Sequence, residues 1–232
     1  FAVRPDSDNL LKVMKKNESI KNDEAFFDHK VFLTVSGQLH LEAMAHGLRK
    51  VYTLGPTFRA ENSKSPVHLS EFYMLELEEA FIESLDDVMS TITKYFKTVT
   101  KEFLDRSLDD VMRINKNSEF NVDERFNWLE KDFQVLTYDE AFKIVAENRD
   151  KIKTLIDYNE GLSKEQEIFI TNHLKVPCFI IDWPKEQKSF YMRQKKSNQN
   201  IVEALDFLIP QVGEVAGGSV REDDYERLKS KM

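Results

Sequence analysis

The hydrophobic pattern changes its period along the chain, and its clearest signal is a pair of strand-like runs. Val51–Phe58 and Glu71–Phe81 are rich in β-branched, aromatic and alternating apolar residues. A polar loop, Asn62–Ser70, separates them and contains several Ser, Asn, Lys and Pro residues. The pattern therefore predicts an antiparallel hairpin with an unusually long tip.

The charges of this hairpin gather on one face. Residues two apart on an extended chain share a face, so Arg59 and Glu61 are expected to point the same way. On the return strand, the residues that alternate onto one face are Phe72, Met74, Glu76 and Glu78. A face with these charges and an exposed Phe would be a poor core, but it is a good floor for a polar ligand.

A capped helix is predicted just before the hairpin. Val31–Val35 is typical of a strand, and Gln38–Arg49 carries apolar residues at the helical period. Ser36 is the expected N-cap. Ser36 and Gln38 then lie beside free backbone N–H groups, where a carboxylate can bind. A capped surface helix with no ligand would explain the same residues.

Further helices are predicted in the middle of the chain, and the amino-terminal part is expected to be mostly irregular. Residues 1–30 are polar and charged, with one short helix candidate at Leu10–Met14. The helical periods after the hairpin cover Ser84–Leu104, Tyr138–Glu147 and Ser163–Leu174. Ser163 followed by Gln166 is typical of a helix cap.

Two buried strands are predicted near the carboxyl end. Val176–Trp183 is almost entirely apolar and is typical of a central strand. Phe190–Arg193 is its expected antiparallel neighbour, and Lys195–Asn200 is expected to be a polar turn. Ile201–Pro210 is the second buried strand.

Acidic residues accompany this second strand. Asp206 shares a face with apolar neighbours, which is costly unless it meets a cation or a metal. Glu214 follows, and the pair Gly217-Gly218 would let the backbone approach a ligand closely. A bulge or tight turn would explain the two glycines equally well.

Length and composition permit a substantial core and exclude several classes of protein. The 232 residues fit one large domain or two small ones, with 41% hydrophobic residues and a mean hydropathy of -0.50. The net charge of -8 argues against nucleic-acid binding by bulk charge alone. Any RNA partner would need a local basic patch or another domain.

The number of cysteines and the lengths of the apolar runs predict where the protein resides. The single Cys178 excludes an internal disulfide framework and fits a reducing compartment, so a cytoplasmic protein is expected. No run approaches the roughly 20 apolar residues of a membrane helix, so no membrane partner is expected. Neither zinc-ligand spacing nor a Walker loop is present in the sequence.

Four segments together resemble a known enzyme family. They are SGQLHLE, GPTFRAENSKSPVHLSEFYMLELEEAF, FYMR and LDFLIPQVGEVAGGSVRE. This order is similar to the catalytic core of class II aminoacyl-tRNA synthetases, and within them to the asparaginyl members of the aspartate-type subgroup. The resemblance implies an α+β fold, an antiparallel β-sheet flanked by helices.

The resemblance also implies a reaction and its substrates. The carboxylate of an amino acid attacks the α-phosphate of ATP, and the aminoacyl group then passes to tRNA. The expected partners are asparagine, tRNA(Asn), ATP with Mg2+, and a second copy in a homodimer. Positioning and charge stabilisation should supply most of the catalysis.

Roles at the ATP site follow from the matching positions. Arg59 would bridge the α-phosphate and the substrate carboxylate, which suits a planar and always charged guanidinium. Glu61 would face the adenylate and the tRNA terminus, and Phe72 would stack on adenine. His68 would meet the outer phosphates, with Leu69 beside it.

The same resemblance assigns the metal and the amino-acid pocket. Asp206 and Glu214 would hold Mg2+ as hard oxygen ligands. Glu78 is expected to be a structural acid, and Arg193 either contacts substrate or caps the sheet. The expected amino-acid-binding residues are Ser36, Gln38, Glu42, Arg59, Glu76, Gly218 and Arg221.

The choice between asparagine and aspartate depends on Leu41, Glu42 and Arg221, which matches the family's Arg that reaches the side-chain oxygen of the substrate. Aspartyl relatives carry a Lys that pairs with the substrate carboxylate, whereas this chain has Leu41 followed by Glu42. A neutral residue with an acid disfavours aspartate and can accept hydrogen bonds from an amide. Two alternatives stay open: an asparagine-synthetase-like or aspartyl-type adenylating paralogue, and a non-catalytic binding paralogue.

Residues 1–232 are expected to be part of a class II catalytic domain. The anticodon-binding domain and the third class II motif of the family are not found in this sequence. Glu226-Arg227-Leu228 resembles that third motif superficially, but it lacks the preceding Gly-rich strand and is expected to be helical.

Overall fold

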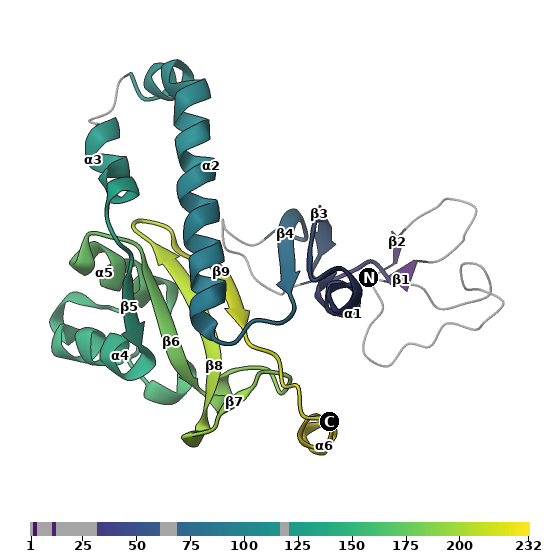
Figure 1. Cartoon of the computed structure of the whole chain (residues 1–232). Coiled ribbons are helices and arrows are strands. Elements are labelled where there is room, and N and C mark those ends of the chain that lie inside the picture. Colours follow the sequence, from purple (N-terminus) through teal and green to yellow (C-terminus); the bar gives the residue numbers. More distant parts are fainter. Residues whose placement is uncertain (1, 4–10, 13–31, 61–68, 117–120) are drawn as a thin grey trace. The chain divides into compact units, whose positions relative to one another are not determined.

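The computed structural model describes residues 2–3, 11–12, 32–60, 69–116 and 121–232. The chain divides into two compact units, Phe1–Ile82 and Glu83–Met232. Each unit has its own strand pairing (Figure 1).

The first unit is built around the predicted hairpin. β3 (Lys50–Phe58) and β4 (Glu71–Glu79) pair antiparallel, which confirms the prediction. Their register sets Thr53 opposite Glu76 and Thr57 opposite Phe72. The second strand ends at Glu79 rather than Phe81, because the backbone turns away at Phe81 with a φ of 62°.

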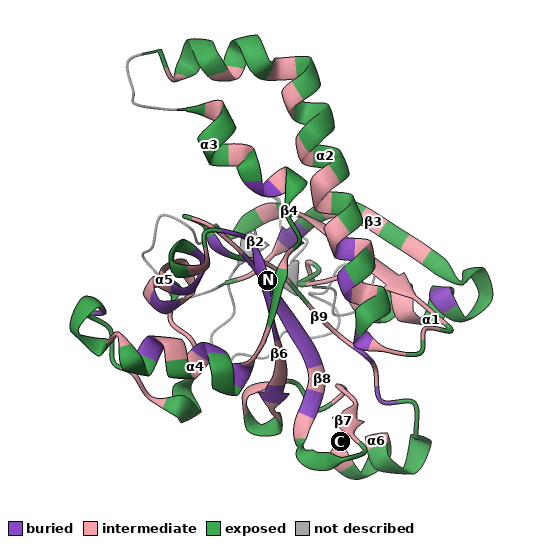
Figure 2. Cartoon of the chain, turned by 60° about the vertical axis from the view of Figure 1, so that its left-hand side comes forward, coloured by how far each residue is buried: buried purple, intermediate pink, exposed green. Residues whose placement is uncertain are grey.

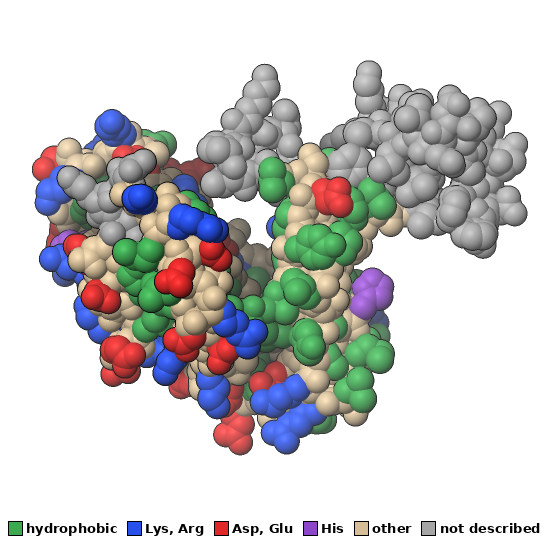
Figure 3. Space-filling view, turned by 90° about the horizontal axis from the view of Figure 1, so that it is seen from above, with side chains coloured by type: hydrophobic (Ala, Val, Ile, Leu, Met, Phe, Trp, Pro, Cys, Tyr) green, Lys and Arg blue, Asp and Glu red, His purple; other side chains and the backbone are tan. Residues whose placement is uncertain are grey.

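The hairpin has two unlike faces. One carries Phe72, Met74 and Glu76, as the alternation predicted, and these residues are partly buried. On the other, Tyr52 is 75% exposed and Tyr73 is 73% exposed. Figure 3 shows hydrophobic side chains gathered over this part of the chain.

The helix α1 (Gln38–Leu48) packs against both strands of the hairpin. Its N-cap is Gly37 and not Ser36, so the predicted N-cap is wrong by one residue. The Ser36 hydroxyl still accepts the Gln38 N–H at 3.1 Å. It also donates to Glu76, and this second bond holds Ser36 outside the cap position.

Two predictions for the amino-terminal part differ from the structure. Phe32–Val35 forms no strand, although the Phe58 N–H donates to the Thr34 carbonyl at 2.9 Å. β1 (Ala2–Val3) and β2 (Leu11–Lys12) pair antiparallel. The helix predicted at Leu10–Met14 is therefore wrong at Leu11–Lys12, and its other residues lie outside the described ones.

The second unit contains a five-stranded sheet in the order β5-β6-β8-β7, with β9 also paired to β8. β5 runs parallel to β6, and the other pairs are antiparallel. This agrees with the predicted α+β fold except for that parallel pair. The strands are β5 (Gln134–Thr137), β6 (Cys178–Pro184), β7 (Gln194–Lys195), β8 (Asn198–Ile209) and β9 (Gly213–Ser219).

Helices cover both faces of this sheet, because its central strands β6 and β8 are apolar on both sides (Figure 2). α4 (Tyr138–Glu147) and α5 (Lys164–Leu174), whose spans are close to the predicted ones, pack on one face. α2 (Leu85–Ile114) packs on the other, where the rings of Phe96 and Phe207 lie 4.9 Å apart. Both predicted central strands are thus confirmed as buried.

Capping residues set where these helices begin. Ser163 and Gln166 form the predicted cap of α5, and Thr137 with Glu140 does the same for α4. α2 begins after Ser84 and runs ten residues beyond the predicted end at Leu104, with non-helical backbone at Ser107. The prediction ended too early because even apolar residues such as Leu108, Met112 and Ile114 are exposed there, so no buried apolar stripe marks this part of the helix.

The remaining elements are short. The strand predicted at Phe190–Arg193 does not pair with β6, because β8 occupies that position; Met192 instead bridges Arg221. The turn predicted over Lys195–Asn200 is shorter in the structure, because Lys195 of β7 already pairs with Asn198 of β8. The others are α3 (Val122–Phe126), α6 (Tyr225–Lys231) and the 3-10 turns Asn127–Glu130, Arg149–Lys151, Tyr158–Glu160 and Lys185–Gln187.

Candidate active site

Arg59 lies over the charged face of the hairpin, directly after β3. Its guanidinium carbon is 5.4 Å from the centre of the Phe72 ring. Nη2 lies 3.7 Å from the sulfur of Met74, and Nε donates to the Val35 carbonyl at 3.3 Å. The structure therefore brings together Arg59 and Phe72, as the two-residue alternation predicted.

Glu76 joins the hairpin to the start of α1. One carboxylate oxygen accepts the Gly37 N–H at 2.8 Å, and the other accepts the Ser36 hydroxyl. A carboxylate oxygen has two lone pairs, so both oxygens keep the capacity to accept from an ammonium group. Gly37 also limits space here, since an added Cβ would lie 3.2 Å from Glu76.

The other predicted residues of the first unit are less informative. Glu61 and His68 lie outside the described residues. Leu69 is 65% exposed just before β4. Gln38 begins α1, and the backbone carbonyl of Glu42 meets the His46 ring at 2.8 Å.

Asp206 meets the cation that its buried position requires. It is 8% exposed on β8, and Lys188 Nζ lies 2.7 Å from each of its carboxylate oxygens. Burial raises the pKa of Asp206, although the charge of Lys188 acts in the opposite direction. The sequence predicted a cation or metal partner, but nothing in it singled out Lys188.

Glu214 lies close to Asp206. A Cβ added to Gly217 would be 3.2 Å from a Glu214 oxygen and 3.5 Å from an Asp206 oxygen. Burial raises the pKa of Glu214, and the negative charges of Asp206 and Glu167 raise it further. The two carboxylates thus lie near each other, beside Gly217.

This pair fits Mg2+ in its chemistry. Mg2+ is usually held by one or two carboxylates, with substrate phosphates and water completing its shell. Among the described residues, no group of three or more His, Cys, Asp or Glu could hold a metal by itself. Asp206 and Glu214 therefore suit a metal that arrives with a phosphate ligand.

Two residues of α5 hold the backbone of Glu214. The Glu214 N–H donates to Glu167 at 2.9 Å, and Lys164 Nζ donates to the Glu214 carbonyl at 3.3 Å. A cavity of about 270 Å³ opens here, lined in part by Trp183, Glu167 and both candidate ligands. Nothing in the sequence singles out Lys164 and Glu167, because charged residues in the first turn of a helix usually face solvent.

The other predicted residues of the second unit take different positions. A Cβ added to Gly218 would lie 3.8 Å from Val88 of α2, on the face opposite to that of Gly217. The guanidinium of Arg221 lies 4.5 Å from the centre of the Tyr191 ring.

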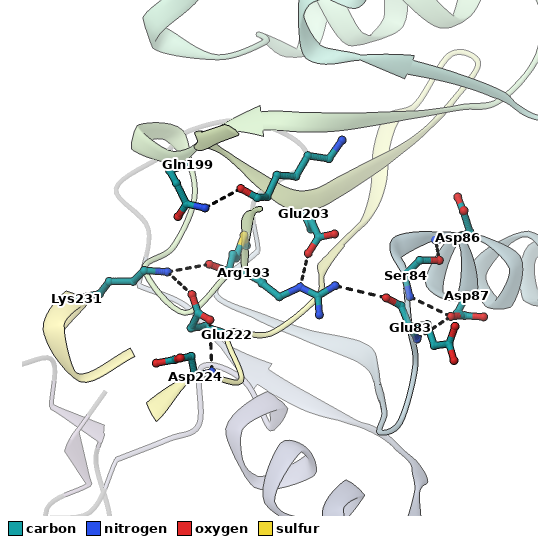
Figure 4. A network of polar contacts seen from close by, with 12 residues as sticks. Glu83, Ser84, Asp86, Asp87, Arg193, Gln199, Glu203, Glu222, Asp224 and Lys231 are labelled. Atoms are coloured by element: carbon teal, nitrogen blue, oxygen red, sulfur yellow. Dashed lines mark hydrogen bonds and ion pairs between the residues drawn. The ribbon is translucent and has the colours of Figure 1, made fainter. Parts of the chain in front are cut away.

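Arg193 is part of a polar network (Figure 4). Its guanidinium donates to Glu203 and, at 3.5 Å, to the Glu83 carbonyl. The Glu203 carboxylate raises the pKa of Arg193. Of the two roles left open by the sequence, these contacts favour a structural one.

Comparisons with known proteins identify relatives over most of the chain. The sequence model of the family "tRNA synthetases class II (D, K and N)" matches residues 10–232. Asparaginyl-tRNA synthetase of Mus musculus is 41% identical over 212 residues, covering 90% of this chain and 44% of the relative. Asparagine–tRNA ligase of Onion yellows phytoplasma is 41% identical over 224 residues, with 95% and 44% covered.

Comparison with solved structures also identifies aminoacyl-tRNA synthetases as similar proteins. Asparaginyl-tRNA synthetase of Pyrococcus horikoshii with asparaginyl-adenylate matches with a TM-score of 0.78 and 33% identity, covering 89% of this chain and 45% of that one. Aspartyl-tRNA synthetase of Entamoeba histolytica matches with a TM-score of 0.73 and 25% identity, with 86% and 40% covered. The chain thus spans less than half the length of the relatives it matches.

The helices were also considered as possible membrane spans. Within the part of the chain that the structure describes, no helix has both the length and the apolar character needed to cross a bilayer.

Proposed function

This chain belongs to the class II tRNA synthetases of the D, K and N type, and we propose that it acts as part of an asparagine–tRNA ligase. In this proposal, ATP activates asparagine to asparaginyl-adenylate, and the asparaginyl group then passes to tRNA(Asn). The observation that carries it is the similarity to asparagine–tRNA ligases over at least 90% of the chain.

The preference for asparagine over aspartate has separate support. The asparaginyl-tRNA synthetases of Pyrococcus horikoshii and Entamoeba histolytica are 33% and 29% identical to this chain, against 25% for the aspartyl-tRNA synthetase of Entamoeba histolytica. Leu41 and Glu42 add a chemical reason, because neither residue can pair with a substrate carboxylate. Arg221 is proposed to reach the side-chain oxygen of asparagine.

Binding of the amino acid uses the start of α1. Glu76 is proposed to accept the α-ammonium group, with Ser36 and Gly37 fixing its carboxylate. Gln38 and Gly218 are each proposed to be amino-acid-binding residues as well. Because two donors already hold the Glu76 carboxylate, this side chain needs little further ordering when the substrate binds.

Activation is a displacement at phosphorus. A carboxylate oxygen of asparagine attacks the α-phosphorus of ATP, the bond to the bridging oxygen breaks, and pyrophosphate leaves with the electron pair. Negative charge builds on the α-phosphate oxygens, and Arg59 is proposed to stabilise it while also holding the carboxylate. Phe72 is proposed to stack on the adenine, with Glu61, His68 and Leu69 at the remaining ATP positions.

Asp206 and Glu214 are the proposed Mg2+ ligands. Their convergent carboxylates offer the oxygen atoms that Mg2+ prefers. When bound, the ion supplies positive charge to the ATP phosphates. Lys164 and Glu167 would keep the Glu214 backbone in place for this role.

Wider properties of the protein follow from the same proposal. Residues 1–232 are proposed to be part of a class II catalytic domain, and the family match over residues 10–232 supports this. A homodimer and the cytoplasm are the proposed assembly and compartment. Sedimentation velocity of the purified full-length protein would measure the assembly, and a monomer across micromolar concentrations would contradict it.

The decisive experiment is ATP–pyrophosphate exchange with the full-length protein, comparing asparagine with aspartate. Exchange that depends on asparagine is expected. Exchange with aspartate alone would favour the aspartyl-type or asparagine-synthetase-like paralogue. A folded protein with no exchange for either amino acid would favour the non-catalytic binding paralogue.

A further inference from the structure

Lys188 forms a closely fitted ion pair with a proposed metal ligand. Its Nζ lies 2.7 Å from both oxygens of Asp206, and the side chains are only 16% and 12% exposed. An ion pair this shielded from water is weakly screened by salt. Lys188 comes directly after the 3-10 turn Lys185–Gln187, which lies against β8.

An aromatic ring fixes the ammonium from a second side. Nζ lies 3.8 Å from the centre of the Trp183 ring, which is carried by the neighbouring strand β6. A ring face attracts a cation, and more strongly where water is excluded. The position of Lys188 is therefore set by two strands of the sheet and not by Asp206 alone.

The pair alters the charge that a metal would meet. Asp206 and Glu214 carry two formal negative charges, and Lys188 offsets one of them. We propose that Lys188 is a positioning residue that serves as the counter-cation of Asp206 and makes divalent-cation binding at Asp206 and Glu214 depend on the phosphates of ATP. This inference rests on the proposed function, which assigns these two acids to the metal.

The physical reason is electrostatic. A divalent cation at Asp206 would lie close to the Lys188 ammonium, and two positive charges in a shielded site repel strongly. Two carboxylates also leave most of the coordination shell empty. A triphosphate supplies both missing parts: oxygen ligands, and negative charge to offset the repulsion.

The unaltered protein gives the first test. Binding of Mn2+, which accepts the same oxygen ligands, can be measured by electron paramagnetic resonance of the free ion, with no amino acid present. We expect weak binding of Mn2+ alone, and binding at least about tenfold tighter with inorganic triphosphate after correction for the Mn2+–triphosphate complex. Tight binding of Mn2+ alone that Asp206→Asn abolishes would overturn the proposal.

A variant tests the role of Lys188 directly. Lys188→Met keeps an apolar stem against Trp183 and removes the charge. The affinity for Mn2+ alone should rise about tenfold or more, and adding Asp206→Asn to the variant should cancel the gain. The matched control is Lys195→Met, which removes an ion pair with Asp182 of similar length, 2.6 Å, and should leave Mn2+ affinity unchanged.

The outcomes separate this inference from the proposed function. A folded Lys188→Met protein with unchanged or weaker Mn2+ binding would contradict the role of Lys188, whatever the exchange assay gives. Exchange without asparagine dependence would contradict the proposed function and leave the Mn2+ result standing. Circular dichroism checks that the variant is folded. If Lys188→Met does not fold, the Mn2+ measurement on the unaltered protein is the test of the proposal.

Discussion

At the scale of single residues, Arg59 is the group on which the proposed chemistry depends most. Its guanidinium contacts Phe72, Met74 and the Val35 carbonyl, all within the first unit. These contacts are weak ones, a ring, a sulfur and one long hydrogen bond. Arg59 can therefore exchange them for phosphate and carboxylate oxygens, which form shorter and stronger bonds with a guanidinium.

Arg59→Ala should abolish ATP–pyrophosphate exchange without unfolding the protein. A loss of about a hundredfold or more is expected, the scale at which one group that stabilises transition-state charge acts. Arg106→Ala is the control, because Arg106 pairs with Glu102 on the exposed surface of α2. Near-normal exchange in Arg59→Ala would remove Arg59 from the mechanism.

At the scale of elements, the turn between β8 and β9 positions Glu214. Gly213 has a φ of 79°, a conformation that glycine adopts easily. A Cβ there would lie 2.6 Å from a Glu167 oxygen and 3.0 Å from Lys164 Nζ. Glycine at this position thus allows α5 to approach the backbone of Glu214.

Gly213→Ala should lower the free energy of unfolding by about 1–3 kcal/mol, because both the backbone and the contact with Glu167 are strained. Urea unfolding, monitored by circular dichroism, measures this free energy. Gly47→Ala is the matched control: Gly47 lies in α1 with open space around it, and alanine should be neutral or stabilise by up to about 1 kcal/mol. Equal stability of the two variants would show that the turn relaxes without cost.

At the scale of the whole molecule, the single cysteine reports on the core of the second unit. Cys178 is fully buried in β6 among residues of α4, α5 and β8. Burial raises the pKa of its thiol from 9.0 to about 12. Between these two values the unfolded chain releases this proton and the folded chain keeps it, so stability falls as the pH rises.

Cys178 should therefore resist iodoacetamide in the folded protein. Labelling of its peptide, followed by mass spectrometry, should be at least about a hundredfold slower than in urea between pH 7 and pH 9. Above pH 9 the thiol should reduce the free energy of unfolding by up to about 1.4 kcal/mol per pH unit, an effect that Cys178→Ala removes. Labelling at equal rates with and without urea would show that this core is open.

Local signals in the sequence determined the elements and much of the first cluster. The alternation in β4 placed Phe72, Met74 and Glu76 on one face, because side chains on a strand alternate by geometry alone. Ser163 with Gln166 fixed the start of α5 for a similar reason, since a cap involves residues only three apart. The position of Asp206 among apolar residues also predicted that it needs a cation or a metal.

Contacts between residues far apart in the chain could not be predicted from the sequence. Lys188 is 18 residues from Asp206, and Glu167 is 47 residues from Glu214. The order of strands brought these side chains together: β8, not Phe190–Arg193, lies beside β6. A lysine in a loop carries no local mark of the buried acid it will meet, because that contact forms only when distant strands pair.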